Sequence, residues 1–190
     1  MLSQRIEFLL HVMGLKKVAR KGWVEKVGVE HPESVADHSF AVAILTMVLS
    51  DMKKLDTEKA MKMALLHDLA EAKMGDFLPE EKRAEVKLRE EKTILEMLSS
   101  LPPKQYEEYS HIWLEFKAQK SREAILVKSL DLIDMAAQAL VYEMEGYDQH
   151  KLEEFWKSVD QNILDEDCFK ILKLLKKMRE AHGKGNNRKV

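Results

Sequence analysis

The stretch AMKMALLHDLAEAKMG, residues 60–75, is the part of the sequence that decides the fold. Apolar residues recur in it at helical spacing, so the sequence predicts a helix over Thr57–Lys73. The adjacent pair His67 and Asp68 interrupts this apolar pattern. An imidazole and a carboxylate in such a helix cost desolvation free energy unless a partner satisfies them. A divalent metal ion would satisfy both side chains.

Two other apolar segments contain residues of the same kinds. His38 comes near the start of a helix expected over Val35–Lys53, and Asp131 interrupts a helix expected over Arg122–Glu145. Asp134 lies three residues after Asp131 and is an alternative ligand or a supporting carboxylate. Two imidazoles and two carboxylates would suit a hard-to-borderline divalent cation and leave coordination positions open for water and a phosphate oxygen. The expected ligands are His38, His67, Asp68 and Asp131.

Glu71 follows His67 by one helical turn and can reach the same region without binding the metal. We expect it to act as a general base or to orient the attacking water. A surface salt bridge with Lys73 or with a neighbouring helix is the alternative. Gly75 then breaks the helix, and the turn returns a further carboxylate, Asp76, toward the same end.

Helical periodicity runs through most of the chain, and seven glycines and four prolines leave little material for turns. No long alternating pattern typical of strands is found, so the sequence predicts an all-α fold. Ser34, Thr57 and Ser121 are the expected N-caps of three helices. The expected helices are Ser3–Val18, Val35–Lys53, Thr57–Lys73, Pro79–Ser100, Pro103–Lys120, Arg122–Glu145, His150–Gln161 and Asp165–Ala181.

The composition is that of an ordinary globular protein, with 190 residues of which 45% are hydrophobic and 34% charged. We expect one domain over residues 1–182 and a polar, flexible tail over residues 183–190. The formal net charge of −2 gives no bulk attraction to a nucleic acid polymer or to an anionic membrane.

The compartment is expected to be the cytoplasm. A single cysteine, Cys168, excludes an internal disulfide bond and fits a reducing environment. The first residues lack the features of a signal peptide, and no run is expected to reach the length of a membrane span.

The segment Pro79–Glu96 is strongly charged, with opposite charges at helical spacing. This pattern is typical of a solvated helix with exposed ion pairs. The functional alternative is that the segment covers the mouth of the site, with Lys82 or Lys87 near a phosphate.

The order of His38, the pair His67-Asp68 and Asp131 resembles that of the HD-domain metal-dependent phosphohydrolases. The flanking sequence resembles the 5'-deoxynucleotidase branch of that family, which removes phosphate from deoxynucleoside monophosphates. The similarity runs from about Phe8 to Tyr142. The motifs that carry it are RKGW at 20–23, PESVADHS at 32–39, LLHDLAEAKMGDFLP at 65–79 and VKSLDLIDMAAQALVYE at 127–143.

That resemblance implies a single-domain HD-type helical bundle with one divalent metal ion (Mn, Co, Fe, Ni, Zn or Mg). It implies that Glu71 and Asp76 are catalytic, with Asp76 protonating the leaving oxygen or holding the sugar. It also implies that Arg20 binds phosphate and that Trp23 forms a wall for the sugar or base. In the better-studied bacterial members the arginine and tryptophan are adjacent, whereas Lys21 and Gly22 separate them here. A core tryptophan and a solvated arginine are the alternative.

The resemblance further implies a homodimer that acts on a small nucleotide. The sequence adds apolar residues that one helix face would not bury, although core packing explains them as well: Ile112, Trp113, Leu114, Phe116, Phe155 and Trp156. Only His111 lies between the His-Asp pair and Asp131, which favours one metal over two. Two other functions stay open: an HD hydrolase acting on a triphosphate, a cyclic nucleotide or a (p)ppGpp-like compound, and a non-catalytic binding module stabilised by a metal.

Overall fold

The computed structural model describes the backbone of residues 2–186 and the side chains of residues 6–183. Over this range it is an all-α bundle, as the sequence predicts. The α-helices are α1 (Leu2–Gly14), α2 (Val35–Met52), α3 (Thr57–Leu66), α4 (Glu71–Met74), α5 (Ala84–Leu98), α6 (Pro103–Ala118), α7 (Arg122–Glu145), α8 (Gln149–Asn162) and α9 (Glu166–Asn186). Two 3-10 turns, η1 (Leu15–Lys17) and η3 (Pro79–Glu81), and a π-helix, η2 (Trp23–Val27), join them.

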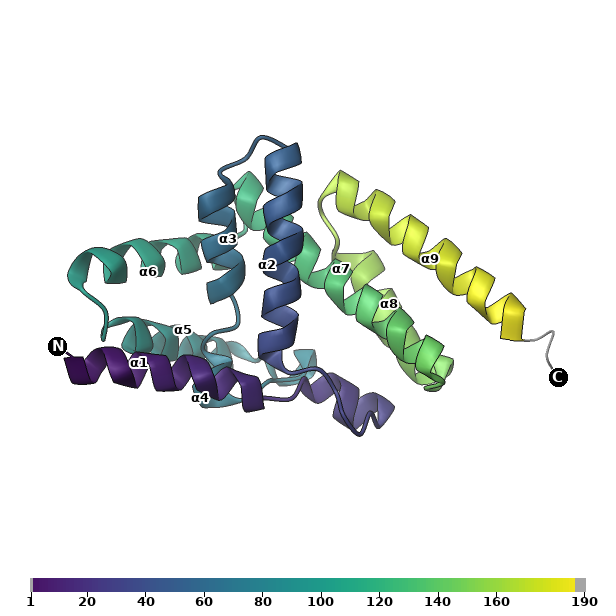
Figure 1. Ribbon diagram of the computed structural model, residues 1–190, viewed down its shortest axis with the longest axis horizontal. Coiled ribbons are helices and arrows are strands. Elements are labelled where there is room, and N and C mark those ends of the chain that lie inside the picture. Colours follow the sequence, from purple (N-terminus) through teal and green to yellow (C-terminus); the bar gives the residue numbers. More distant parts are fainter. Residues whose placement is uncertain (1, 187–190) are drawn as a thin grey trace.

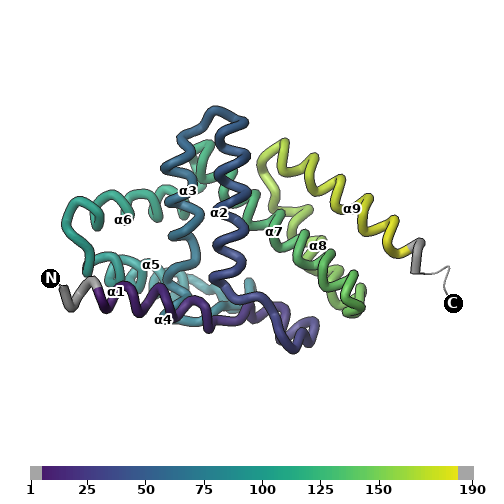
Figure 2. The backbone as a smooth tube through the Cα atoms, viewed as in Figure 1, coloured from purple at the N-terminus to yellow at the C-terminus, as the bar shows by residue number. Residues whose placement is uncertain are grey.

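Helix α2 stands in the middle of the bundle and packs against both α3 and α7 (Figure 1). Helix α7 also supports α8 and α9, whereas α6 packs against α3, α5 and α7. Figure 2 shows that α6 and α9 lie at opposite ends of the molecule. The helices that carry the proposed metal ligands therefore meet at the centre of the fold.

The core contains most of the large apolar side chains that the sequence left unassigned between core and surface. Trp113 and Trp156 are each 1% exposed, and Ile112 and Phe116 are also buried. These four residues therefore supply no surface for a second subunit, and the argument for a dimer from them is wrong. Leu114 alone of this set is exposed.

The entry into α2 is fixed by local hydrogen bonds. The Ser34 side chain accepts from the backbone N–H of Asp37, and the Asp37 carboxylate accepts from the backbone N–H of Ser34, which makes a capping box. The Val35 N–H also donates to the Val18 carbonyl at 2.8 Å. Because His38 lies in the first turn of α2, these contacts fix its position. In α3 the N-cap is Asp56 and not Thr57.

The predicted helix over Thr57–Lys73 is interrupted exactly where the His-Asp pair lies, because α3 ends at Leu66 and α4 begins at Glu71. The Nδ1 atom of His67 lies 2.6 Å from the Ala64 carbonyl oxygen. In an uninterrupted helix that oxygen would accept from the backbone N–H of Asp68. The side chain of His67 thus competes with the backbone for its acceptor, and the chain turns.

Other boundaries also differ from the expectation, and α1 ends at Gly14 instead of Val18. Trp23–Val27 forms a π-helix where an irregular segment was expected, and α5 begins at Ala84, after a separate 3-10 turn, instead of at Pro79. Helix α9 continues to Asn186, four residues into the predicted tail. The last four residues of that tail, 187–190, lie outside the described residues.

Helix α2 extended by Lys53 is long and apolar enough to cross a membrane, since Val35–Lys53 has 19 residues and a mean hydropathy of 1.3. The expectation that no run approaches such a length is therefore wrong. The helix nevertheless packs against α3 and α7, and it buries the polar side chains of His38, Thr46 and Ser50 within the bundle. Its position is that of a core helix.

Candidate active site

The four predicted metal ligands come together at the centre of the bundle. His38 Nε2 lies 3.2 Å from Asp131 Oδ1 and 3.7 Å from Asp68 Oδ2. His67 Nε2 lies 3.0 Å from the same oxygen of Asp68. His38 comes from α2, the His67-Asp68 pair from the turn after α3, and Asp131 from α7. Two imidazole nitrogens and two carboxylates thus converge, as the sequence predicts.

The donor set fits a divalent metal. The Nε2 atoms of His38 and His67 are buried and have no hydrogen-bond partner. In His67 the Nδ1 atom is already engaged, because the Ala64 carbonyl can only accept and Nδ1 must carry the proton. In the neutral tautomer that this bond selects, the Nε2 lone pair faces the carboxylate of Asp68, and a cation between the two would stabilise the pair. A cluster of His38, His67 and Asp68 with ligand atoms this close can hold a metal ion.

A proton on His38 can offset part of the negative charge of the nearby carboxylates. Burial and the charge of Arg20 lower the pKa of His38. The nearby carboxylate of Asp131 and the hydrogen bond to Asp134 outweigh both effects and raise that pKa to about 9. Burial raises the pKa of Asp131, but Lys128 and His38 lower it well below its ordinary value. The carboxylate is therefore ionised and available as a ligand.

Asp131 and Asp134, between which the sequence did not decide, contact different nitrogens of His38. Asp134 Oδ2 lies 2.6 Å from Nδ1, whereas Asp131 Oδ1 faces Nε2. A carboxylate that accepts from Nδ1–H fixes the tautomer and orientation of an imidazole ligand. This geometry supports Asp131 as the ligand and Asp134 as the residue that orients His38.

Glu71 is buried beside the cluster. Its side chain faces Lys82, with 3.4 Å between Oε1 and Nζ, whereas Oε2 has no hydrogen-bond partner. Burial and the nearby charge of Asp68 raise the pKa of Glu71 well above its ordinary value. The alternative of a surface ion pair with Lys73 or with a neighbouring helix is wrong, because Lys73 pairs with Glu96 and the partner of Glu71, Lys82, meets it in a buried position.

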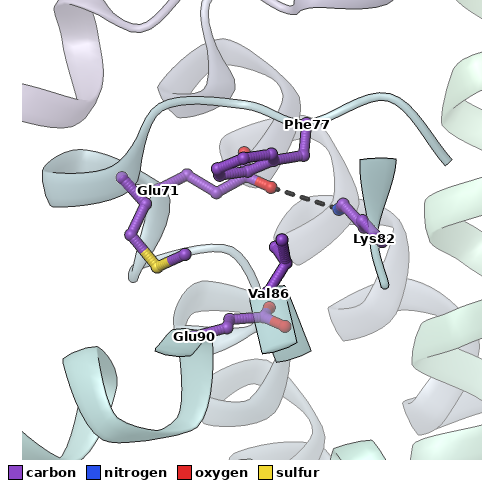
Figure 3. A pocket seen from close by; sticks show the side chains of 6 residues that line it. Glu71, Phe77, Lys82, Val86 and Glu90 are labelled. Carbon is purple, nitrogen blue, oxygen red and sulfur yellow. Dashed lines mark hydrogen bonds and ion pairs between the residues drawn. The ribbon is translucent and has the colours of Figure 1, made fainter. Parts of the chain in front are cut away.

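A cavity of about 10 Å³, roughly the room that one water molecule needs, opens beside Glu71 (Figure 3). Figure 3 shows Glu71 and Lys82 joined across it, with Phe77 on one side and Val86 and Glu90 on the other. A buried carboxyl group next to a space of this size is suitably placed to hold a water.

Asp76 lies at the edge of the site and not among the four predicted ligands. Its Oδ2 accepts from the backbone N–H of Lys21 at 2.7 Å, which ties the turn after α4 to the segment that carries Arg20. The charge of Asp76 also contributes to raising the pKa of Glu71 and of Lys82. The catalytic role implied for Asp76 stays a prediction.

Arg20 and Trp23, the two predicted substrate residues, lie in different environments. Arg20 points toward the cluster, with Nη1 3.7 Å from Asp68 Oδ2. Trp23 is 1% exposed, stacks on Phe155 with 4.2 Å between ring centroids, and donates from Nε1 to Glu33. The packing of Trp23 is that of the core-anchoring alternative, and its role as a wall for the substrate stays a prediction.

Comparison with known proteins agrees with this geometry. The sequence profile described as "HD domain" matches residues 12–171. This chain belongs to the HD-domain family. Among curated relatives, the 5'-deoxynucleotidase HDDC2 of Danio rerio is 33% identical over 95% of this chain and 90% of its own length. The human 5'-deoxynucleotidase HDDC2 is 36% identical over 80% of this chain and 75% of its own length.

Solved structures share the fold of this HD domain. The PH0347 protein from Pyrococcus horikoshii OT3 is 36% identical and superposes with a TM-score of 0.69, covering 94% of this chain and 98% of that one. The prediction of a single HD-type helical bundle is thereby confirmed.

Lys128 is a residue of this HD domain that the sequence analysis missed. Its Nζ lies 2.7 Å from Asp131 Oδ2, so that the two oxygens of Asp131 face different partners. The i, i+3 spacing of Lys128 and Asp131 on one helix was a signal that could have revealed the pair. Glu33 was also missed, and it accepts from Trp23 and lies 3.8 Å from Arg20 Nε.

Proposed function

We propose that this chain is a metal-dependent 5'-deoxynucleotidase that hydrolyses deoxyribonucleoside 5'-monophosphates to a deoxynucleoside and phosphate. The observation that carries the proposal is the pair of buried, unpartnered Nε2 atoms on His38 and His67, which face the carboxylates of Asp68 and Asp131. The names of the relatives support the substrate class.

One divalent ion of the set Mn, Co, Fe, Ni, Zn or Mg would be held by His38, His67, Asp68 and Asp131. Such an ion supplies charge neutralisation at the phosphoryl oxygens and lowers the pKa of a coordinated water. The two carboxylates offset its charge.

The remaining residues would handle the water, the proton and the phosphate. Glu71 accepts the proton of the attacking water, whose oxygen bonds to phosphorus as the bond to the 5'-oxygen breaks. Asp76 has one of two roles. In its protonated form it gives the proton that the leaving 5'-oxygen requires, or it holds the sugar. Arg20 offers a planar donor fork to the phosphate.

The test is phosphate release from a panel of nucleotides by metal-stripped protein that is given single divalent cations. We expect cleavage of deoxynucleoside 5'-monophosphates and none of the corresponding cyclic phosphates. Cleavage of a triphosphate, a cyclic nucleotide or a (p)ppGpp-like compound instead would favour the other HD hydrolases. No cleavage of any nucleotide with any cation would favour the non-catalytic module.

The ligand assignment has its own measurement, which is metal content by atomic emission. His67→Ala and Asp68→Ala should each lose the metal, because each removes a ligand from a site with few to spare. His111→Ala is the matched control, since His111 is exposed on α6. Full metal occupancy in both site variants would refute the assignment.

We also propose a cytoplasmic homodimer. The support for dimerisation is a stripe of exposed apolar side chains at four-residue spacing along α2, from Phe40, 67% exposed, to Met52, 73% exposed. Exposed apolar patches of this kind are typical of subunit contacts. We refer to the four residues as the α2 stripe: Phe40, Ile44, Val48 and Met52.

A further inference from the structure

We propose that Lys82 and Lys128 join Arg20 in a three-cation cradle that binds the phosphate group of the substrate. The inference rests on the proposed function and assigns a binding role to two lysines that come from separate parts of the chain. Lys82 follows the 3-10 turn η3, Lys128 is in α7, and Arg20 precedes the π-helix η2.

Lys128 is held at the edge of the ligand cluster with donors to spare. Its Nζ contacts Asp131 Oδ2 at 2.7 Å, and its side chain is 33% exposed. The other oxygen of Asp131 faces His38 Nε2. An ammonium group has three N–H donors and no acceptor, so a single ion pair leaves donors for an anion that reaches the cluster.

Lys82 approaches the site from another direction. Its Nζ lies 3.4 Å from Glu71 Oε1, and the side chain is 36% exposed (Figure 3). The segment Pro79–Glu96 was expected to be solvated, with Lys82 or Lys87 near a phosphate as the alternative. Lys87 is exposed, whereas Lys82 faces the buried Glu71, so the geometry selects Lys82.

Each of the three cations contacts a different carboxyl group of the site: Arg20 contacts Asp68 at 3.7 Å, Lys82 contacts Glu71 at 3.4 Å and Lys128 contacts Asp131 at 2.7 Å. Burial lowers the pKa of Arg20 and of Lys82, but in both cases nearby carboxylates, Asp68 first among them, outweigh burial. For Lys128 the charge of Asp131 is the largest cause of a raised pKa, and Asp68 adds to it. Lys82 opposes that rise.

A phosphate monoester carries about −1.5 to −2 charges at neutral pH. It would approach a site that already contains the carboxylates of Asp68, Asp131 and Glu71. A divalent ion offsets only part of that negative charge. Ammonium groups that are already held against those carboxylates gain a further favourable partner when a dianion arrives.

The test measures inorganic phosphate binding to metal-loaded protein by calorimetry, together with its inhibition constant and the KM for a deoxynucleoside monophosphate. Lys82→Met and Lys128→Met should each weaken phosphate binding and raise KM by roughly ten- to hundredfold, the scale of a lost charge-assisted hydrogen bond. Inhibition by the uncharged deoxynucleoside product should not change, and Lys128→Arg should restore part of the affinity.

Lys59→Met is the matched control. Lys59 is 29% exposed and pairs with Glu115 at 2.9 Å and with Glu123 at 3.3 Å, so it resembles the two lysines in burial and pairing. It lies in the first turn of α3, at the end away from His67. We expect the control to lose thermal stability at most, with phosphate binding unchanged.

The results distinguish the phosphate-binding role of the two lysines from the proposed 5'-deoxynucleotidase activity. Unchanged phosphate affinity in both lysine variants would overturn the cradle and leave structural ion pairs. Loss of metal from Lys128→Met at saturating metal would overturn the role of Lys128 and show that it only positions Asp131. If the parent cleaves no deoxynucleotide while both variants bind phosphate more weakly, the proposed function fails and the cradle stands.

Discussion

Asp134 Oδ2 lies 2.6 Å from Nδ1 of His38, so that the carboxylate holds the imidazole from the side opposite to the ligand cluster. Asp134→Ala removes this support but no ligand. We expect the variant to keep its metal at saturation, with an affinity about 10- to 100-fold weaker. Metal titration against a competing chelator measures the change.

Asp131→Ala is the comparison for that prediction, because Asp131 Oδ1 faces Nε2 instead. It should lose the metal altogether. Asp134→Asn keeps an oxygen that can accept from Nδ1–H and should lie closer to the parent. If Asp134→Ala loses the metal while Asp131→Ala retains it, the two roles are reversed.

The affinity for the metal should rise with pH. In the metal-free protein the pKa of His38 is raised from 6.5 to about 9, so the proton must leave before Nε2 can bind a cation. Below pH 9 the apparent association constant should increase about tenfold per pH unit from this group. Calorimetry in buffers of different ionisation enthalpy counts the proton released.

The raised pKa of His38 also affects the stability of the metal-free protein, which should fall with pH whereas the metal affinity rises. A pKa raised on folding stabilises the metal-free protein fully below pH 6.5, and this contribution disappears as the pH rises through about 9. The free energy of unfolding of the metal-free parent and of His38→Ala is compared between pH 6.5 and 9. A difference between them that grows in favour of the parent as the pH rises would contradict the raised pKa of His38.

Glu71→Ala should separate catalysis from metal binding. The variant should retain the metal, since the four ligands remain, and lose activity by about two to four orders of magnitude. It should fold, because a buried carboxyl group with an unpartnered oxygen and a raised pKa opposes folding at neutral pH. Phosphate release and metal content are measured on the same sample.

Glu90→Gln is its matched control, because Glu90 lines the same cavity but pairs with Lys117 at 2.8 Å. The control should keep the parent activity. Parental activity in Glu71→Ala with the metal in place would assign the activation of water to Asp76 or to the metal alone.

Charging the α2 stripe should dissociate the dimer. The parent should scatter light with twice the mass of the 22.1 kDa chain, and Val48→Asp should give the mass of one chain. Leu88→Asp on α5 is the control, because Leu88 is 68% exposed and lies outside the stripe. A single-chain mass for the parent at micromolar concentration would remove the proposal.

Gly75 should resist substitution, because its φ of +77° and ψ of 167° place it in a region that side-chain-bearing residues rarely adopt. Gly75→Ala should cost about 1–3 kcal/mol of folding free energy and displace Asp76, with a loss of activity. Gly14→Ala is the control, since its φ is helical and an added Cβ makes only an ordinary contact. Thermal unfolding of both variants decides the matter.

Features that depend on nearby residues were predicted well from the sequence. The bounds of α7 agree with the expectation, and the predicted end of α2 differs by one residue. Ser34 and Ser121 cap these two helices as their local sequence indicates. The convergence of His38, His67, Asp68 and Asp131 was predicted for the same reason, since a polar residue on an apolar helix face is visible without knowing its partners.

Features that depend on distant residues were not predictable in this way. Trp23 is buried because Phe155, far along the chain, covers its ring. Lys82 cannot be told apart from Lys87 in its charged segment until Glu71 is seen beside it. The break after Leu66 is a local feature that was also missed, because helical periodicity does not register a side chain such as that of His67 contacting the backbone carbonyl of Ala64.

The hydrogen bonds that fix the start of α2 also join the two ends of the segment between residues 19 and 34, which contains Arg20 and Trp23. Arg20 N–H donates to the Glu33 carbonyl at 3.1 Å, next to the isolated bridge between Ala19 and Ser34. Arg20 and His38 are thus positioned by one group of main-chain contacts, and a change that breaks those contacts would displace both side chains together.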